Sequence, residues 1–525
     1  MPLPWATRTT LPEPLRDLRF SLWIVRNNRP LTIGEHDREL RDIFEYIFQA
    51  DDIWSEGGIA IFGILAYWIT KSFEYKEKLL SAIPFGDVRH NALELELATK
   101  RACADFGIGS FEEGEDKSIT IDTVTDSVHA TISDSASNII KGWISFDGYE
   151  CSCHLLALST TEYLESDGVK EVFGKMRGMT THFNHSVIGR NLLHDCQKKY
   201  NLPATAPPQD NATRGAWKGS AQQSSWYAQQ QEAVQLYDVE QPNAVDNPDG
   251  SPYKDHKLQL FEWDVARESS YILAMTAMDI DILQSTKTAT SSLVLPVVGR
   301  LTYNLKADTP MKHNGNFVQI TSLEVQEARE LLRKDIIRRF YTELSECKLE
   351  DFAVATFVDP RYKALDFRGL EEWQRGELTA HQVIEWARQA YDADWKPKAA
   401  TSQPVDAPQV SAPRLKVSNL VSFLDEEEDD EAAIVQEEVE FVGRESEFTL
   451  YLSMPPAEKS LDPLHWWGDR EEKLPNLSRM ARQFLAPPAS TAGVERMFSA
   501  CGQLHSDLKN KCLRDDPATL HDGIH

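Results

Sequence analysis

The sequence predicts an α/β fold in its first third, followed by a mostly helical part. A β-branched and aromatic run at 59–69 is typical of a buried strand, with a partner strand around 78–85. A helical stretch at 91–106 leads to a short strand at 128–133. Strands that alternate with helices favour an α/β layer. After Cys151 the apolar residues instead recur with helical spacing, which predicts helices.

Composition limits the classes of protein to which the chain can belong. Its 525 residues, 41% of them hydrophobic, are enough for two or three structural units with a buried core. There are 55 basic and 82 acidic residues, so the net charge of −27 leaves any nucleic-acid contact to local basic patches. No apolar run reaches membrane-spanning length, and the first residues lack a signal-peptide pattern. Seven cysteines without paired CxxC spacing predict a reducing compartment and no self-contained zinc finger.

Two helical regions, 154–200 and 325–350, flank a stretch at 203–252 that is rich in Pro, Gln, Asn and Asp and is predicted to be partly loop. In the second region four apolar residues recur at every fourth position and form one stripe: Leu332, Ile336, Phe340 and Leu344. A Pro-rich linker at 396–419 runs into an acidic tract at 425–440, predicted to be disordered.

The chain becomes compact again near its C-terminus. Residues 474–485 place four apolar residues on one helical face, namely Leu474, Leu477, Ala481 and Leu485. Pro487 and Pro488 end this helix, and Ser490 is predicted to cap the next one. That second helix carries apolar residues at positions 0, 3, 4 and 7 of its face: Val494, Met497, Phe498 and Cys501.

Three acidic residues stand beside apolar segments at predicted element ends. They are Asp52, Asp134 and Glu495, separated by 82 (134 − 52) and 361 (495 − 134) residues. Cleavage of phosphodiesters by two Mg²⁺ ions needs bridging carboxylates of this kind. Among 82 acidic residues, however, spacing alone favours solvated or capping carboxylates.

The sequence segments around these acids resemble segments of the hAT superfamily of cut-and-paste DNA transposases and their domesticated relatives. The matching segments follow one another in the family's order and are DDIWSEGG (51–58), TISDSASNIIKGW (131–143), ECSCHLLALS (150–159), QDNATRGAW (209–217), FVDPRYKALDF (357–367) and the segment 462–504. The last segment resembles the family's C-terminal dimerisation element and is the longest and most specific of them.

The resemblance implies a ribonuclease-H-like α/β core, interrupted by a large, mostly α-helical insertion and completed by C-terminal helices that also build a dimer interface. It implies that Asp52, Asp134 and Glu495 hold two Mg²⁺ ions for hydrolysis at a transposon end, followed by attack of a DNA 3′-hydroxyl on target DNA. A homodimer or higher oligomer, contact with DNA and a nuclear location follow from the same resemblance, and the lack of a membrane-spanning apolar run predicts no membrane partner.

Three departures from the family pattern give further expectations. No BED-type zinc finger is expected near the N-terminus. The residues before Asp52 have helical spacing (Leu40, Ile43, Phe44, Ile47 and Phe48), which predicts that the core lacks its first, central strand. The family's Arg-Trp pair is split into Arg214 and Trp217, which are the candidate DNA-binding residues; displacement of the tryptophan weakens its expected stacking on an extruded base.

Several side chains have a structural alternative. Cys151, Cys153 and His154 are predicted to pack, since three ligands this close together need a distant fourth for a metal site. The basic residues Arg329, Arg333, Lys334, Arg338 and Arg339, and separately Arg496, Lys509, Lys511 and Arg514, are expected to be solvated rather than phosphate-binding. The candidate interface residues are Trp466, Trp467, Phe484, Val494, Met497 and Phe498, with core packing as the alternative.

The sequence therefore predicts a protein derived from an hAT transposase, with a dimerisation role and a catalytically impaired core. Two alternatives stay open, an active Mg²⁺-dependent transposase and a non-catalytic interaction or transcription-regulatory module. The predicted divisions are an N-terminal remnant (1–50), a first core part (51–153), a helical insertion (154–395), a linker with the acidic tract (396–445) and the C-terminal dimerisation part (446–525).

Overall fold

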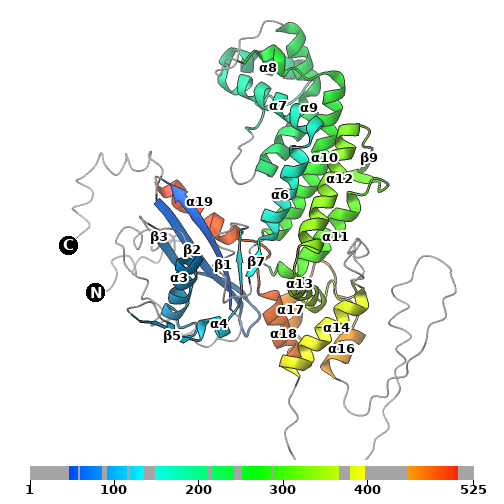
Figure 1. Cartoon of the computed structure of the whole chain (residues 1–525). Helices are drawn as coiled ribbons and strands as arrows, with labels where there is room; N and C mark the ends of the chain where they lie inside the picture. Colours follow the sequence, from blue (N-terminus) through cyan, green and yellow to red (C-terminus); the bar gives the residue numbers. More distant parts are fainter. Residues whose placement is uncertain are drawn as a thin grey trace, which may run out of the picture.

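The computed structural model describes residues 47–56, 59–85, 92–114, 119–134, 148–209, 216–241, 251–285, 288–365, 379–396 and 446–505. A twisted sheet lies beside an elongated helical part; the C-terminal helix α19 (Ala492–His505) runs along the sheet, and α17 (Pro463–Gly468) and α18 (Pro475–Leu485) lie at the lower end of the helical part (Figure 1). The predicted combination of α and β structure is confirmed. Within these residues no helix is both long and apolar enough to cross a membrane.

The main sheet has five strands in the order β3-β2-β1-β6-β7. They are β1 (Ile47–Glu56), β2 (Ile59–Ile69), β3 (Tyr75–Phe85), β6 (Val128–Ser133) and β7 (Gly148–Glu150). The first three form an antiparallel meander, whereas β6 runs parallel to β1 and β7 runs parallel to β6. The predicted strands at 59–69, 78–85 and 128–133 are confirmed.

The prediction that the core lacks a strand before Asp52 is wrong. Residues Ile47–Glu56 form β1, the central strand, and Asp52 lies within it. The apolar spacing that indicated a helix ends in Ile47 and Phe48, which are strand residues; a short apolar run does not distinguish the two structures. Pairing with β2 on one side and β6 on the other gives the β1 backbone its hydrogen bonds and decides the outcome. Residues 40–46 lie outside the described part.

Both faces of the sheet are covered, which explains the nearly continuous apolar run of β2. One face packs against α3 (Ala92–Asp105), and its buried side chains include Phe62, Ile64, Ala66 and Trp68. On the opposite face lie Leu65, Tyr67 and Ile69, which belong to the large core shared with the helical part. The alternation along β2 therefore assigns each sheet position to one of two faces.

The helical part contains α6 (Ser152–Leu164), α7 (Asp167–His185), α8 (Val187–Lys199), α9 (Ala216–Glu240), α10 (Leu260–Leu283), α11 (Val294–Asn304), α12 (Leu323–Ile337), α13 (Glu346–Val358) and α14 (Ala380–Ala390). Shorter pieces are α4 (Val124–Ser127), η2 (Tyr253–His256), η3 (Ser291–Leu293), the π-helical turns η4 (Arg338–Thr342) and η6 (Tyr391–Trp395), and the hairpins β4–β5 (Phe111–Glu113, Ile119–Asp122) and β8–β9 (Met311–His313, Asn316–Val318).

Two sequence predictions for this part have different outcomes. The stripe of Leu332, Ile336, Phe340 and Leu344 is confirmed, because all four side chains are buried. The stretch 203–252 is less loop-like than its composition indicated, since it contains α9, a helix of 25 residues. Tertiary burial of Tyr227, Val234 and Tyr237 outweighs the unfavourable composition.

The C-terminal helices are α16 (Glu447–Ser453), α17 (Pro463–Gly468), α18 (Pro475–Leu485) and α19 (Ala492–His505). The apolar face predicted for residues 474–485 is confirmed in and just before α18, since Leu474, Leu477, Ala481 and Leu485 are fully buried. Ser490 does not cap α19: the helix begins two residues later, and the Ser490 hydroxyl instead donates to the Leu283 carbonyl at 3.3 Å.

A buried acid in α10 makes the stability of the helical part depend on pH. Asp279 is fully buried, and burial raises its pKa to about 6 although the Arg300 guanidinium acts in the opposite direction. A raised folded-state pKa means that unfolding becomes more favourable as the pH rises from about 4 through 6. We expect Asp279→Asn to unfold at a higher urea concentration than wild type at pH 8, by about 2 kcal/mol in free energy, and to lose this advantage at pH 4. A constant difference between the two chains over this pH range would contradict this assignment.

Candidate catalytic face of the sheet

Asp52 and Asp134 occupy neighbouring positions on adjacent parallel strands. In the register between β1 and β6, Asp51 is the partner of Ser133. Asp52 is the next residue of β1, and Asp134 directly follows the last residue of β6; hydrogen-bonded strands lie about 4.8 Å apart. The fold therefore brings together two positions that are 82 residues apart in the sequence.

Both positions belong to the same face of the sheet. Asp52 is the register partner of Gly63, and directly opposed antiparallel residues share a face. On β6, Ile132 is buried in the core that also contains Leu65, and Asp134 follows Ile132 by the two-residue strand repeat. This is the face that α19 covers, because a Cβ added to Gly63 would lie 2.7 Å from Phe498 and 3.1 Å from Val494.

Glu495 lies in the first turn of α19, next to the residue that contacts Gly63. Its side chain is half-buried. Burial and the neighbouring Cys151 raise the pKa of the Cys153 thiol, and the negative charge of Glu495 adds to this rise. The structure thus places Asp52, Asp134 and Glu495 on one side of the sheet. Among the side chains that it describes, which do not include that of Asp52, no group of three or more His, Cys, Asp or Glu could hold a metal ion.

Cys151 connects the end of β6 to the start of α19. Its backbone N–H donates to the Ser133 carbonyl at 2.7 Å, and its sulfur accepts the Thr491 N–H at 3.4 Å. The Ser152 N–H donates to the Ala489 carbonyl at 2.9 Å. A hydrogen bond from Cys153 lowers the pKa of the Cys151 thiol. These contacts favour the structural role predicted for this segment over a metal site.

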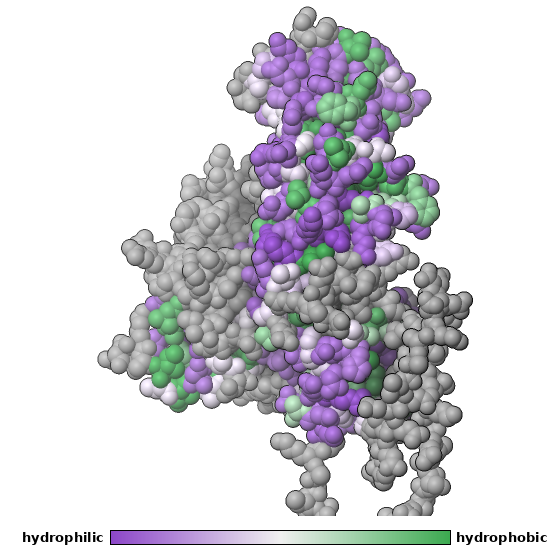
Figure 2. Space-filling model, turned by 45° about the vertical axis from the view of Figure 1, so that its right-hand side comes forward, coloured by the Kyte–Doolittle hydropathy of each residue, from purple (hydrophilic) through white to green (hydrophobic). Residues whose placement is uncertain are grey.

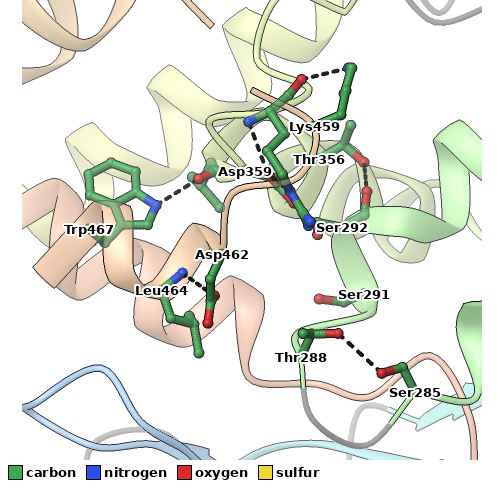
Figure 3. Close-up of polar contacts among 12 residues, drawn as sticks. Ser285, Thr288, Ser291, Ser292, Thr356, Asp359, Lys459, Asp462, Leu464 and Trp467 are labelled. Atoms are coloured by element: carbon green, nitrogen blue, oxygen red, sulfur yellow. Dashed lines mark hydrogen bonds and ion pairs between the residues drawn. The ribbon is translucent and has the colours of Figure 1, made fainter. Parts of the chain in front are cut away.

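Hydrogen bonds around a buried ion pair join the C-terminal region to the helical part (Figure 3). Asp359, fully buried at the end of α13, accepts Nε of Arg361 at 2.9 Å, Nη2 of Arg361 at 2.7 Å and the Ser292 hydroxyl at 2.7 Å. Lys459 donates to the Arg361 carbonyl at 2.6 Å. Lys363 contributes a further link, since it donates to the Tyr451 carbonyl, and burial lowers its pKa to about 8. The FVDPRYK segment therefore serves as a structural connection.

This ion pair predicts a measurable loss of stability. Asp359→Asn keeps the side-chain shape but removes charge-assisted hydrogen bonds, so we expect a loss of about 2 kcal/mol in urea unfolding. Asp469→Asn is the control, because the Asp469 side chain is 60% exposed and pairs with His465 rather than with Arg361. Equal unfolding midpoints for Asp359→Asn and wild type would contradict the structural role of the pair.

The structure supports core packing for the aromatic residues that were predicted as interface anchors. Within the single chain, Trp466, Trp467, Phe484, Val494 and Phe498 are buried, and Met497 is partly buried against them. The Trp467 indole N–H donates to the Val358 carbonyl at 2.8 Å. A side chain that is already enclosed by its own chain is not exposed to a partner. Their burial favours the core-packing alternative, and the anchoring role stays a prediction.

The basic residues of α12 and η4 are paired within the chain, and the expectation of a solvated face is wrong for Arg329. Arg329 is buried and donates to backbone carbonyls, including that of Asn304 at 2.8 Å. Arg338 pairs with Asp335 and Glu343, and Arg339 pairs with Asp335. Lys509, Lys511 and Arg514 lie outside the described residues.

The candidate DNA-binding residues cannot be placed. Arg214 lies outside the described residues, and of Trp217 only the backbone, in α9, is described. Their role stays a prediction. Sequence reasoning in turn missed Gly63, Tyr67, Glu77 and Gly493, which fix the position of α19. A glycine inside a strand indicates close approach of another element, and Gly63 carried that signal.

Comparison with known proteins supports the class that this architecture indicates. Residues 447–518 match the model of the hAT family C-terminal dimerisation region. The chain is 30% identical over 193 residues to "Putative AC transposase" of Zea mays, covering 34% of this chain and 23% of the relative, and equally similar to "Putative AC9 transposase" of Zea mays, covering 22% of it. It is 22% identical over 377 residues to human "Zinc finger BED domain-containing protein 4", covering 71% of this chain and 28% of the relative.

The protein is accordingly transposase-like. More specifically, it resembles hAT-family transposases, and its residues 447–518 match the family's C-terminal dimerisation region. The chain spans about a quarter of the length of these curated relatives.

Proposed function

We propose that the chain forms the ribonuclease-H-like core of a Mg²⁺-dependent DNA transposase, with Asp52, Asp134 and Glu495 as the catalytic acids. One observation carries the proposal: Asp52 and Asp134 are neighbours on parallel strands, on the face against which the helix bearing Glu495 packs. The mixed sheet with helices on both faces supports the core. The presence of β1 removes the main reason for expecting an impaired core.

The donor set fits Mg²⁺. All three side chains offer carboxylate oxygens, the ligands that hard divalent cations prefer. Asp134 and Glu495 are half-buried, so solvent and a DNA phosphate still have access to them. Bound Mg²⁺ would stabilise the charge that develops on the attacking and leaving oxygens of an in-line displacement.

The three acidic residues would hold the cations in position and would not themselves form bonds to the DNA. Asp52 lies in the central strand β1, Asp134 directly follows the neighbouring strand β6, and Glu495 lies in the covering helix α19. Such pre-organisation is what lets oriented charges stabilise a transition state. The substrate would be a DNA strand at a transposon end, and the second step would join its 3′-hydroxyl to target DNA.

The proposal is tested with the full chain on DNA that carries candidate transposon ends and on supercoiled plasmid. We expect strand cleavage that requires Mg²⁺ or Mn²⁺ and is stopped by EDTA. A folded wild-type chain that cleaves neither DNA with either cation would favour the alternative, a non-catalytic interaction or regulatory module.

Self-association is a second proposed function, favoured by the match of 447–518 to a dimerisation region. Among the described residues of this region, Leu461 is the large hydrophobic residue that is exposed, at 38%. The surface through which the region would contact a second copy would therefore be mainly polar. The helical part also shows a largely hydrophilic surface with small separate apolar patches (Figure 2). Sedimentation equilibrium over a range of concentrations should give the mass of a dimer or higher oligomer; a monomer mass throughout would reject this proposal. A nuclear location is proposed with the DNA-directed activity.

A further inference from the structure

Two glycines allow α19 and the sheet to approach each other closely from opposite sides. A Cβ on Gly63 of β2 would meet Phe498, Met497 and Val494 of α19 at 2.7, 2.9 and 3.1 Å. On Gly493 of α19, a Cβ would lie only 2.0 Å from the Tyr67 hydroxyl oxygen. Side chains of α19 thus occupy the space that a side chain at Gly63 would fill, and the Tyr67 side chain of β2 occupies the space that a side chain at Gly493 would fill.

The Tyr67 hydroxyl is fixed by a strand partner. Tyr67 is buried at 1% exposure, and Glu77 is its register partner on β3. Burial and the charge of Glu77 raise the pKa of Tyr67 far above its usual value, so the phenol stays protonated and donates to the Glu77 carboxylate. The Cβ position of Gly493 lies 3.4 Å from Oε2 of Glu77 as well. The pair therefore presents a rigid surface to the first turn of α19.

Glu495 is flanked by residues that this surface holds. Gly493, two residues before Glu495, lies against Tyr67, and Val494, one residue before Glu495, lies against Gly63. Arg496, directly after it, exerts its positive charge on Glu77 and donates to the Gln284 carbonyl at 3.2 Å. The depth and rotation of the first helical turn, and so the position of Glu495, are set by these neighbours.

We propose that Tyr67, Glu77 and Gly493 form a positioning device that sets Glu495 against Asp134 for cation binding. This inference rests on the proposed function. It requires that the Tyr67 hydroxyl group is what leaves no room for a side chain at position 493. Removal of the hydroxyl should then compensate for an added methyl group, since Cζ of Tyr67 lies 3.3 Å from the Cβ position, a tight but tolerable contact.

The test measures Mn²⁺ binding to the full chain by electron paramagnetic resonance, with the urea unfolding midpoint of each variant recorded in parallel. We expect Gly493→Ala to weaken Mn²⁺ binding about tenfold, the effect of a displaced supporting contact, and Gly493→Ala combined with Tyr67→Phe to return it to within about twofold of wild type. Gly174→Ala in α7 is the matched control, because nothing lies within 4 Å of its Cβ position, and it should leave Mn²⁺ binding unchanged.

The outcomes separate this inference from the proposed function. Wild-type Mn²⁺ binding that is absent or insensitive to Asp134→Asn overturns the proposed function and this inference with it. If wild type binds Mn²⁺ through Asp134 but Gly493→Ala binds it equally well, or the double variant is not restored, only the positioning device is wrong. If Gly493→Ala fails to fold, a double variant that folds and binds Mn²⁺ supports the contact, and one that also fails to fold overturns it.

Discussion

Asp134→Asn is expected to reduce Mg²⁺-dependent DNA strand cleavage by about 10³-fold while the chain stays folded. The carboxylate lies at the end of β6 beside the position of Asp52, where the proposed cations bind. Stabilisation by bound cations is worth several kcal/mol in the transition state, and about 4 kcal/mol corresponds to about 10³ in rate. The amide keeps the size of the side chain but is a much weaker cation ligand.

Glu150→Gln provides the matched control for the cleavage measurement. Glu150 is the last residue of β7 and lies near the end of β6. It is the register partner of Ser133, so it belongs to the sheet face opposite to that of Ile132. Loss of its charge should leave the cleavage rate within about twofold of wild type, as for surface changes away from a site. Equal activity of Asp134→Asn and wild type, or equal loss in both variants, would contradict the catalytic role of Asp134.

Trp467→Ala is expected to destabilise the single chain by about 3–5 kcal/mol, the usual cost of deleting a buried large aromatic side chain. Trp467 is fully buried, packs against Tyr451 at 5.1 Å and Trp466 at 5.0 Å between ring centroids, and donates to the Val358 carbonyl. Its removal would open a cavity where α17 meets α13 and leave that carbonyl without its donor. Urea unfolding at low protein concentration, where self-association is weakest, measures the effect.

His465→Ala on the same helix is the control for Trp467→Ala, because the His465 side chain is 72% exposed. It should change stability by less than about 0.5 kcal/mol. If Trp467 were an interface anchor instead, Trp467→Ala would leave the unfolding of the monomer unchanged and weaken only self-association. That result would favour the interface role over core packing.

How much of the fold the sequence could predict depended on whether local pattern and tertiary packing agreed. The strands at 59–69 and 128–133 and the helix at 475–485 were predicted correctly, because their apolar patterns match the faces that are buried. At 47–56 the local pattern was ambiguous, and pairing with two neighbouring strands decided for β1. The 25 residues of α9 likewise owe their helical form to packing that composition does not report.

For the candidate site, the sequence identified the three acids through the resemblance but could not show how they come together. The register between β1 and β6 and the contact of α19 with Gly63 are tertiary facts. The role of the aromatic residues was uncertain for a related reason: a Trp in a family dimerisation region satisfies an interface and a core equally well until its burial is known. Gly493 carried no local signal, because the Tyr67 hydroxyl that excludes a side chain comes from a strand more than 400 residues earlier.

The central claim is that Asp52, Asp134 and Glu495 share one cation site. Its most direct test is Mn²⁺ binding by the full-length wild type and by Asp52→Asn, Asp134→Asn and Glu495→Gln, each with a normal unfolding midpoint. The account predicts that every single substitution weakens binding at the same site, and that Glu150→Gln does not. Mn²⁺ binding that is unchanged in all three variants would contradict it.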